Sequence, residues 1–422
     1  MGYEALIFLS MVAIFVVLAM GFKLPIGISL ALSALAGALL GGEGLAIRHL
    51  VEGSFGYFDT ILVIVSAMIF MQVLKAAGIL DTVTTNLLKT FYSRKTALLF
   101  TMMFIVMFPG MITGSSTAAV LSTGTLIAPV MIKLGLPPIK TAAFIAMGGI
   151  LGMLAPPVNI LVMIMGGGVD MPYMGITIPL LIIVIPLAVI FSLYMGREIK
   201  VIEYDQMITI LPVIPEKKTG FLLYLPLVIL IFLLAAQSIS VPYLSDLGIP
   251  AAFLLSSIIG CFCGRPFNFL RATQDALKEA MPILSILVGV GMFIQVMTLT
   301  GGRGWIVMSF LSLPPALLYL GIGASMPLFG AVSAYGSASI LGVPFILALI
   351  NKNAVITSSA LSAIAGLGDL MPPTALAGIF AAQVVGEKNY FKVLRYCLLP
   401  AALELAMGII ILLLAPLLDK II

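Results

Sequence analysis

Long apolar stretches alternate with short polar segments along the whole chain. Apolar runs of about 20 residues recur from end to end, which is the length a helix needs to cross the hydrocarbon core of a bilayer. A transmembrane barrel would instead show short segments of alternating hydrophobicity. The pattern therefore predicts an all-α polytopic membrane protein. Helices are expected near 5–22, 25–42, 58–77, 139–167, 173–195, 220–237, 248–263, 282–300, 354–384 and 396–416.

Two of these helices contain adjacent prolines at the same place. Leu151–Asn159 reads LGMLAPPVN, and Leu367–Ala375 reads LGDLMPPTA. A proline inside a helix removes a backbone donor and clashes with the preceding turn, at a cost of about 3 kcal/mol. We predict that the helices 139–167 and 354–384 are both broken at their Pro-Pro pairs.

Two further segments, near 95–133 and 313–351, are apolar at both ends and rich in glycine, serine and threonine in the middle. This arrangement predicts re-entrant hairpins that enter and leave the membrane on one side. An amphipathic segment, Leu80–Phe91, precedes the first hairpin.

The chain also resembles itself. FMQVLKAAG (Phe70–Gly78) is similar to FIQVMTLTG (Phe293–Gly301), and TGSST (Thr113–Thr117) is similar to YGSAS (Tyr335–Ser339). The two Pro-Pro stretches follow in the same order. Three ordered matches indicate a duplication, with a first repeat at 1–200, a linker at 201–219 and a second repeat at 220–422.

Each repeat is expected to cross the membrane about five times, because its hairpin does not cross. An odd number of crossings inverts the second repeat, which is the plan of many secondary transporters. Cytoplasmic loops carry excess Lys and Arg. With the N-terminus outside, only Arg48, Arg303, Lys352 and Lys420 fall on the outer side. The linker is then cytoplasmic, hairpin one opens to the cytoplasm and hairpin two opens to the outside.

Composition narrows the function. Hydrophobic residues make up 62% and charged residues 9% of the chain, whereas soluble domains are about a quarter charged. His49 is the only histidine, the three cysteines lie in or beside apolar segments, and no phosphate-binding P-loop motif is present. We therefore expect neither an enzyme nor an organic cofactor. A channel is the alternative, but hairpins opening to opposite sides favour alternating access.

The breaks and hairpin tips supply the predicted chemistry. A broken helix frees carbonyl oxygens and exposes a positive half-helix N-terminus; oxygens suit a hard cation such as sodium, and the N-terminus suits a carboxylate. The alternative is that the hydroxyls only pack helices together. The candidate side chains are Ser115, Ser116, Thr117, Ser333, Ser337 and Ser339 at the tips, and Asn159 and Thr374 after the breaks.

Asp369 stands apart, since it lies inside an apolar segment and has no acidic counterpart in the first repeat. An intramembrane carboxylate is costly and is a functional candidate by default. It either helps to couple transport to a cation or proton, or faces the cavity merely solvated. Lys75 is expected near a membrane edge, which leaves the predicted site without a positive side chain.

The stretch Gly110–Leu161 resembles the large membrane subunit of tripartite ATP-independent periplasmic (TRAP) transporters. Its Gly-Ser-Ser tip, its Pro-x-Met before the hairpin's exit and its Gly-Gly-x-x-Gly before Pro-Pro carry the likeness. The resemblance implies an elevator-type fold of the ion transporter superfamily, about ten transmembrane helices, and location in a bacterial or archaeal inner membrane. It also implies two partners, a small four-helix membrane subunit and a periplasmic or lipid-anchored solute-binding protein.

By the same likeness, sodium would occupy two sites. Gly114, Ser115 and Ser116 with Gly152 and Pro156 of the first break form one. The other is formed by Gly336, Ser337, Gly368 and Pro372. The resulting hypothesis is sodium-coupled import of a carboxylate-bearing solute, with Thr117, Asn159, Ser339 and Thr374 contacting the substrate. The alternative is a stand-alone carboxylate or cation/proton carrier of the same superfamily.

Overall fold

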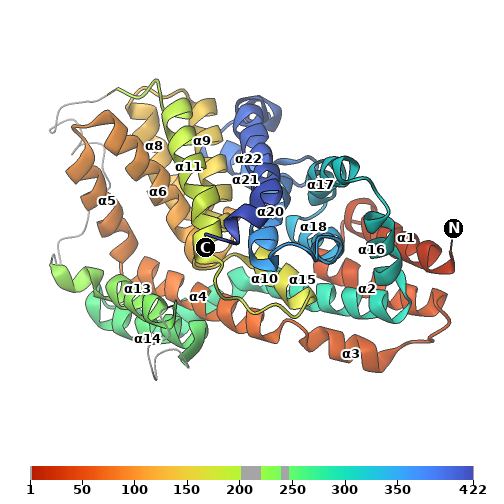
Figure 1. The fold of residues 1–422 in the computed structure, drawn as a ribbon. Coiled ribbons are helices and arrows are strands. Elements are labelled where there is room, and N and C mark those ends of the chain that lie inside the picture. Colours follow the sequence, from red (N-terminus) through yellow and green to blue (C-terminus); the bar gives the residue numbers. More distant parts are fainter. Residues whose placement is uncertain (1, 201–219, 239–246, 422) are drawn as a thin grey trace.

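A computed structural model describes residues 2–200, 220–238 and 247–421 (Figure 1). Every regular element in these ranges is a helix, which confirms an all-α polytopic fold. The predicted linker, 201–219, lies outside the described residues, and the number of crossings stays a prediction. Within the described part, seven helices are long and apolar enough to cross a membrane: Tyr3–Gly21, Phe58–Ala76, Lys95–Thr113, Ser116–Lys133, Thr177–Met195, Phe269–Leu299 and Tyr390–Leu418.

The helices before the first hairpin follow the apolar pattern with one addition. The amphipathic helix α3 was not predicted, because its polar residues lie outside any long apolar run. The elements are α1 (Tyr3–Val16) with a π-helical end (Val17–Gly21), α2 (Ile26–Leu40), α3 (Ile47–Phe55), α4 (Phe58–Ala76) and the arm α5 (Ile79–Phe91).

Hairpin one and the first broken helix come next. The chain reverses at Gly114, and the first broken helix is interrupted between Leu154 and Ile160. The elements are α6 (Lys95–Thr113), α7 (Ser116–Ala119), a π-helical turn (Val120–Gly124), α8 (Thr125–Lys133), α9 (Pro138–Leu154), α10 (Ile160–Gly168) and α11 (Thr177–Met195).

The second half repeats this order of elements. Two helices are longer than predicted. α22 already begins at Tyr390. α15 starts at Phe269, where the Asn268 side chain accepts a hydrogen bond from the Arg271 amide and caps a polar first part. The elements are a 3₁₀ turn (Phe221–Tyr224), α13 (Leu225–Ser238), α14 (Gly248–Cys263), α15 (Phe269–Leu299), α16 (Gly302–Leu311), α17 (Pro315–Gly330), α18 (Ala334–Ser337), a π-helical turn (Ala338–Gly342), α19 (Val343–Ala348), α20 (Ala354–Gly366), a 3₁₀ turn (Leu367–Leu370), α21 (Leu376–Val384) and α22 (Tyr390–Leu418).

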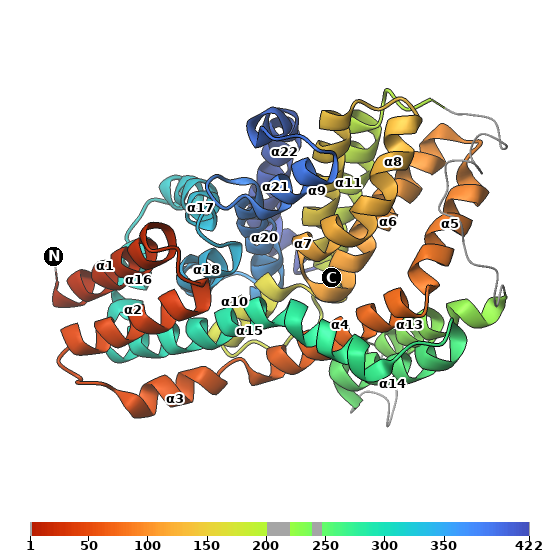
Figure 2. The same ribbon diagram turned by 180° about the vertical axis from the view of Figure 1, so that it is seen from behind.

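The helices form two groups with different directions. The helices α2, α3 and α4 pack along α15 in one layer, and α14 packs on α4. From this layer α6, α9, α11, α20 and α22 stand upright (Figures 1 and 2). Hairpin one and both breaks adjoin α6, α9 and α20, and the second tip, between α17 and α18, packs against α20. The candidate site is therefore built from the upright helices and from hairpin two beside them.

The orientation predicted from the charges can be tested by labelling. Hairpin one should be re-entrant, although both of its arms are long enough to cross. In a background without the natural cysteines, Lys133→Cys should react with an impermeant thiol reagent only from the cytoplasm, and Asn351→Cys only from outside. Both positions are exposed. Labelling of the two from the same side would contradict the inverted repeat.

Candidate ion and substrate site

The first hairpin tip is shaped by Gly114 and Ser115. Gly114 ends α6 in the left-handed conformation, with φ of 65°, and a Cβ there would lie 2.5 Å from the Ile160 side chain. Both the backbone and the space therefore require glycine. Ser115 begins α7 by accepting a hydrogen bond from the Ala118 amide at 3.3 Å. Ser116, the next residue, is buried.

The second tip has a different register from the one predicted. Here Ser333 caps α18 by accepting from the Gly336 amide at 3.1 Å, so Ser333 is the structural counterpart of Ser115. The pairing of TGSST with YGSAS was wrong by one helical turn. Gly336 and Ser337 lie within the short helix α18. The Ser337 hydroxyl donates to the Met326 carbonyl at 2.7 Å, and that of Ser339 donates to the Gly336 carbonyl at 2.9 Å.

Polar side chains close both breaks. The Asn159 side-chain oxygen, Oδ1, accepts a hydrogen bond from the Val162 amide at 3.0 Å and caps α10. Its amide nitrogen donates to the Leu154 carbonyl at 3.0 Å and to the Ser362 hydroxyl at 3.1 Å. In the second break the Thr374 hydroxyl donates to the Ala331 carbonyl at 2.8 Å. These two side chains, predicted to contact substrate, are engaged in holding the breaks.

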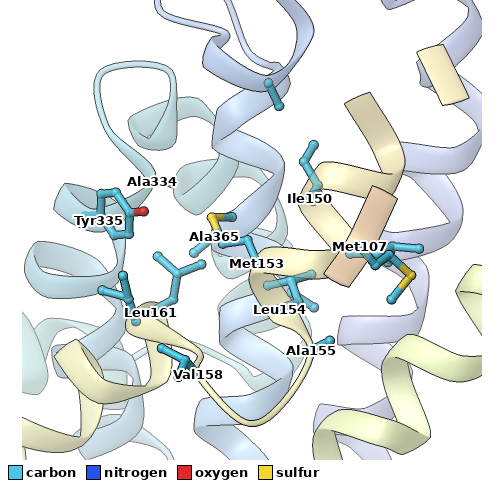
Figure 3. Close-up of a cluster of buried hydrophobic side chains, with 14 of the residues drawn as sticks. Met107, Ile150, Met153, Leu154, Ala155, Val158, Leu161, Ala334, Tyr335 and Ala365 are labelled. Atoms are coloured by element: carbon cyan, nitrogen blue, oxygen red, sulfur yellow. The ribbon is translucent and has the colours of Figure 1, made fainter. Parts of the chain in front are cut away.

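Each hairpin crosses its broken helix at a pair of glycines. A Cβ on Gly152 would lie 2.4 Å from the Met107 carbonyl oxygen, and one on Gly110 would lie 2.8 Å from the Gly152 backbone. In the second half, a Cβ on Gly368 would lie 2.6 Å from the Gly330 Cα. Two of the glycines predicted to bind ions, Gly152 and Gly368, therefore allow close backbone approach. Figure 3 shows the buried apolar side chains around the first break, including Met107 and Met153.

The two halves meet at Asp369. The Ser116 hydroxyl donates a hydrogen bond to the Asp369 carboxylate. The Tyr335 hydroxyl, from the second tip, donates to the Gly114 carbonyl at 3.3 Å. Both Asp369 and Tyr335 are buried. Oxygen atoms from hairpin one, hairpin two and the second break are thus brought together.

These residues line a cavity of about 380 Å³, which we call the central cavity. Its wall includes Ser115, Ser116, Thr117, Tyr335 and Asp369, and also Lys75 and Glu279. Ser337, Ser339, Asn159 and Thr374 are not among the residues of this wall.

Lys75 was expected near a membrane edge, but its side chain reaches the central cavity. Its ammonium lies 3.9 Å from the Glu279 carboxylate, a separation at the limit of an ion pair. The contact between Lys75 and Glu279 was not predicted. The helix that carries Glu279, α15, was expected to begin only after this residue, whereas it begins at Phe269. The cavity therefore has a positive side chain that the predicted site lacked.

The sequence matches one protein-family model over residues 11–418, and that family is described as the tripartite ATP-independent periplasmic transporter, DctM component. No curated protein matches the chain.

Two solved structures share the fold at low sequence identity. The YdaH transporter of Alcanivorax borkumensis is 18% identical, with a TM-score of 0.64; the match covers 92% of this chain and 96% of that one. The MtrF protein of Neisseria gonorrhoeae, described as illuminating a class of antimetabolite efflux pumps, is 16% identical with a TM-score of 0.59, over 87% of this chain and 83% of that one.

Proposed function

The chain belongs to the DctM family of tripartite ATP-independent periplasmic transporters, and from this premise we propose that it imports an organic acid driven by a sodium gradient. It is a multi-pass protein of the inner membrane and a secondary transporter by family.

The contact between Ser116 and Asp369 is the observation that carries the proposal. Sodium prefers oxygen ligands, and the Gly114 carbonyl, the tip hydroxyls and the Asp369 carboxylate supply them from two inverted halves. A cation bound here would hold hairpin one against the second break. A second ion at Gly336, Ser337, Gly368 and Pro372 is also proposed, with backbone oxygens as its main ligands because the Ser337 hydroxyl is engaged.

The central cavity also has features that suit a carboxylate. Lys75 supplies a positive charge, and its ion-pair partner among the described residues is Glu279, at 3.9 Å. The α21 N-terminus has no side-chain cap, and its first residue, Leu376, lines the same cavity. Free amides at a helix N-terminus bind anions. Thr117 adds a hydroxyl, and most of the wall is apolar, which suits an organic acid with a hydrocarbon body.

We further propose that the upright helices move as one body against the layer of α2, α3, α4 and α15, in an elevator motion. The glycine crossings join each hairpin tightly to its break, so these parts are expected to move together. As in TRAP systems generally, the partners would be a small four-helix membrane subunit and an extracytoplasmic solute-binding protein.

Uptake into proteoliposomes tests this function. The chain, reconstituted with its membrane partner, should import a labelled carboxylate from a panel of mono- and dicarboxylates presented on the binding protein. Import should require an inward sodium gradient and should not require ATP. Full uptake with potassium replacing sodium and with only a proton gradient would contradict sodium coupling.

That contrary result would favour the second candidate, a stand-alone carboxylate or cation/proton carrier. Asp369 is the observation that supports it, because a buried carboxylate beside a solute cavity can carry a proton. Uptake that proceeds without the binding protein would distinguish this carrier from the tripartite system.

A further inference from the structure

A second, larger cavity of about 640 Å³ lies between the arm α5, α6, α13 and the first break. We call it the lateral cavity. No described residue lines both this cavity and the central cavity. Leu87 of the arm, Phe108 of hairpin one and Leu230 of α13 form parts of its wall, and Pro156 and Pro157 lie at its inner end.

The wall of the lateral cavity has very few groups that could form hydrogen bonds with water. Among the described residues of the wall, those with a hydroxyl are Thr84, Thr177 and Tyr224, and the Tyr224 hydroxyl accepts a hydrogen bond from the Asn86 side-chain amide nitrogen at 2.8 Å. A buried water needs two to four polar partners, and apolar cavities stay dry or take up apolar molecules. The occupant must therefore be hydrocarbon.

Apolar side chains also surround the opening. Phe104 of α6 and Val228 and Ile231 of α13 line the cavity and are exposed, Ile231 by 67%. Of the helices that carry the opening, α6 is long and apolar enough to cross a membrane, and α13 is a shorter apolar helix. In a membrane-spanning protein, an opening between such helices is expected to face lipid tails. Acyl chains make up the hydrocarbon core of the bilayer, so even a site with low affinity for them is occupied.

We propose that the lateral cavity binds one acyl chain of a membrane phospholipid. A protein helix is about 10–12 Å across with its side chains, so a helix of a partner subunit can cover the opening but is too wide to enter it. A narrow, flexible alkyl chain can enter and reach the prolines of the first break. Because the walls come from both the arm and hairpin one, the bound chain fills the space between them.

Quenching of tryptophan fluorescence by brominated lipids tests this site without a transport assay. Trp305 is the only tryptophan, so Trp305→Phe gives a dark background. In it, Phe108→Trp reports from the cavity wall, Phe70→Trp from a fully buried position, and Phe232→Trp from an exposed position on α13 outside the cavity. In nanodiscs of phospholipid brominated on its acyl chains, Phe108→Trp should be quenched nearly as strongly as Phe232→Trp, and Phe70→Trp hardly at all.

A filling variant identifies the route of quenching. Ala235 lines the lateral cavity, and Ala235→Phe should occupy part of it and reduce quenching of the Phe108→Trp reporter at least twofold, while leaving Phe232→Trp unchanged. Quenching of Phe108→Trp no stronger than that of Phe70→Trp would overturn the proposal. Strong quenching that Ala235→Phe does not reduce would also overturn it, since the lipid would then contact Phe108 from outside the cavity.

Discussion

Asp369→Asn should weaken sodium binding by roughly one and a half to three and a half decades, because removing one charge from a buried, hydrogen-bonded charge pair costs about 2–5 kcal/mol. The asparagine keeps the size of the side chain and can still accept a hydrogen bond from Ser116. It loses the negative charge that would face the cation. Folding should therefore survive while ion binding fails.

The readout is the midpoint of thermal unfolding, Tm, of the purified protein. A ligand that binds only the folded state raises the stability with its concentration, so sodium chloride should raise the wild-type Tm above that in choline chloride of equal ionic strength. In Asp369→Asn the sodium-specific rise should disappear. Asp275→Asn is the matched control, since Asp275 is exposed on α15 and, within the described part of the chain, forms an ion pair with Lys278 alone. An unchanged sodium response in Asp369→Asn would remove this carboxylate from the ion site.

Gly152→Ala should prevent the first hairpin from crossing its broken helix. The new Cβ would lie 2.4 Å from the Met107 carbonyl oxygen and 2.9 Å from the Met107 Cα. These are backbone atoms and cannot rotate away. Overpacking a close contact costs about 1–3 kcal/mol and sometimes more, so we expect a Tm lowered by several degrees or a failure to obtain monodisperse protein.

The matched control is Gly321→Ala, in α17. A Cβ at Gly321 meets nothing within 4 Å, and alanine is favoured over glycine in a helix interior by roughly 1 kcal/mol. This variant should be as stable as the wild type or slightly more stable. If Gly152→Ala behaved like the control, the close crossing would be absent from the folded protein.

The apolar pattern was enough to predict most of the helices and both breaks. Apolar runs and prolines are local signals, and each acts on its own segment of chain. The first half of α15 and the helix α3 were missed for the same reason, because their polar residues carry no membrane signal. Sequence similarity also identified the family, since the tip and break of the first half lie close together in the chain.

The contacts between distant segments could not be predicted in the same way. Whether Ser333 or Ser337 caps the second tip depends on where the chain turns, and both lie in similar small-residue sequence. Asn159 looked available to a substrate until its partners, Leu154 and Ser362, were known. Lys75 joins the central cavity only because α4 packs beside α15. Such facts belong to the packing of the helices.

The glycine crossings also bear on how this protein can acquire new substrates. Because Gly110 meets Gly152 and Gly330 meets Gly368 through backbone atoms, neither crossing depends on a side-chain rotamer. A library of variants at Lys75, Thr117 and Phe380, all on the central cavity wall, can therefore vary solute preference while the crossings stay intact. In directed evolution, tolerated substitutions should accumulate on that wall, and almost none should be tolerated at the four glycines.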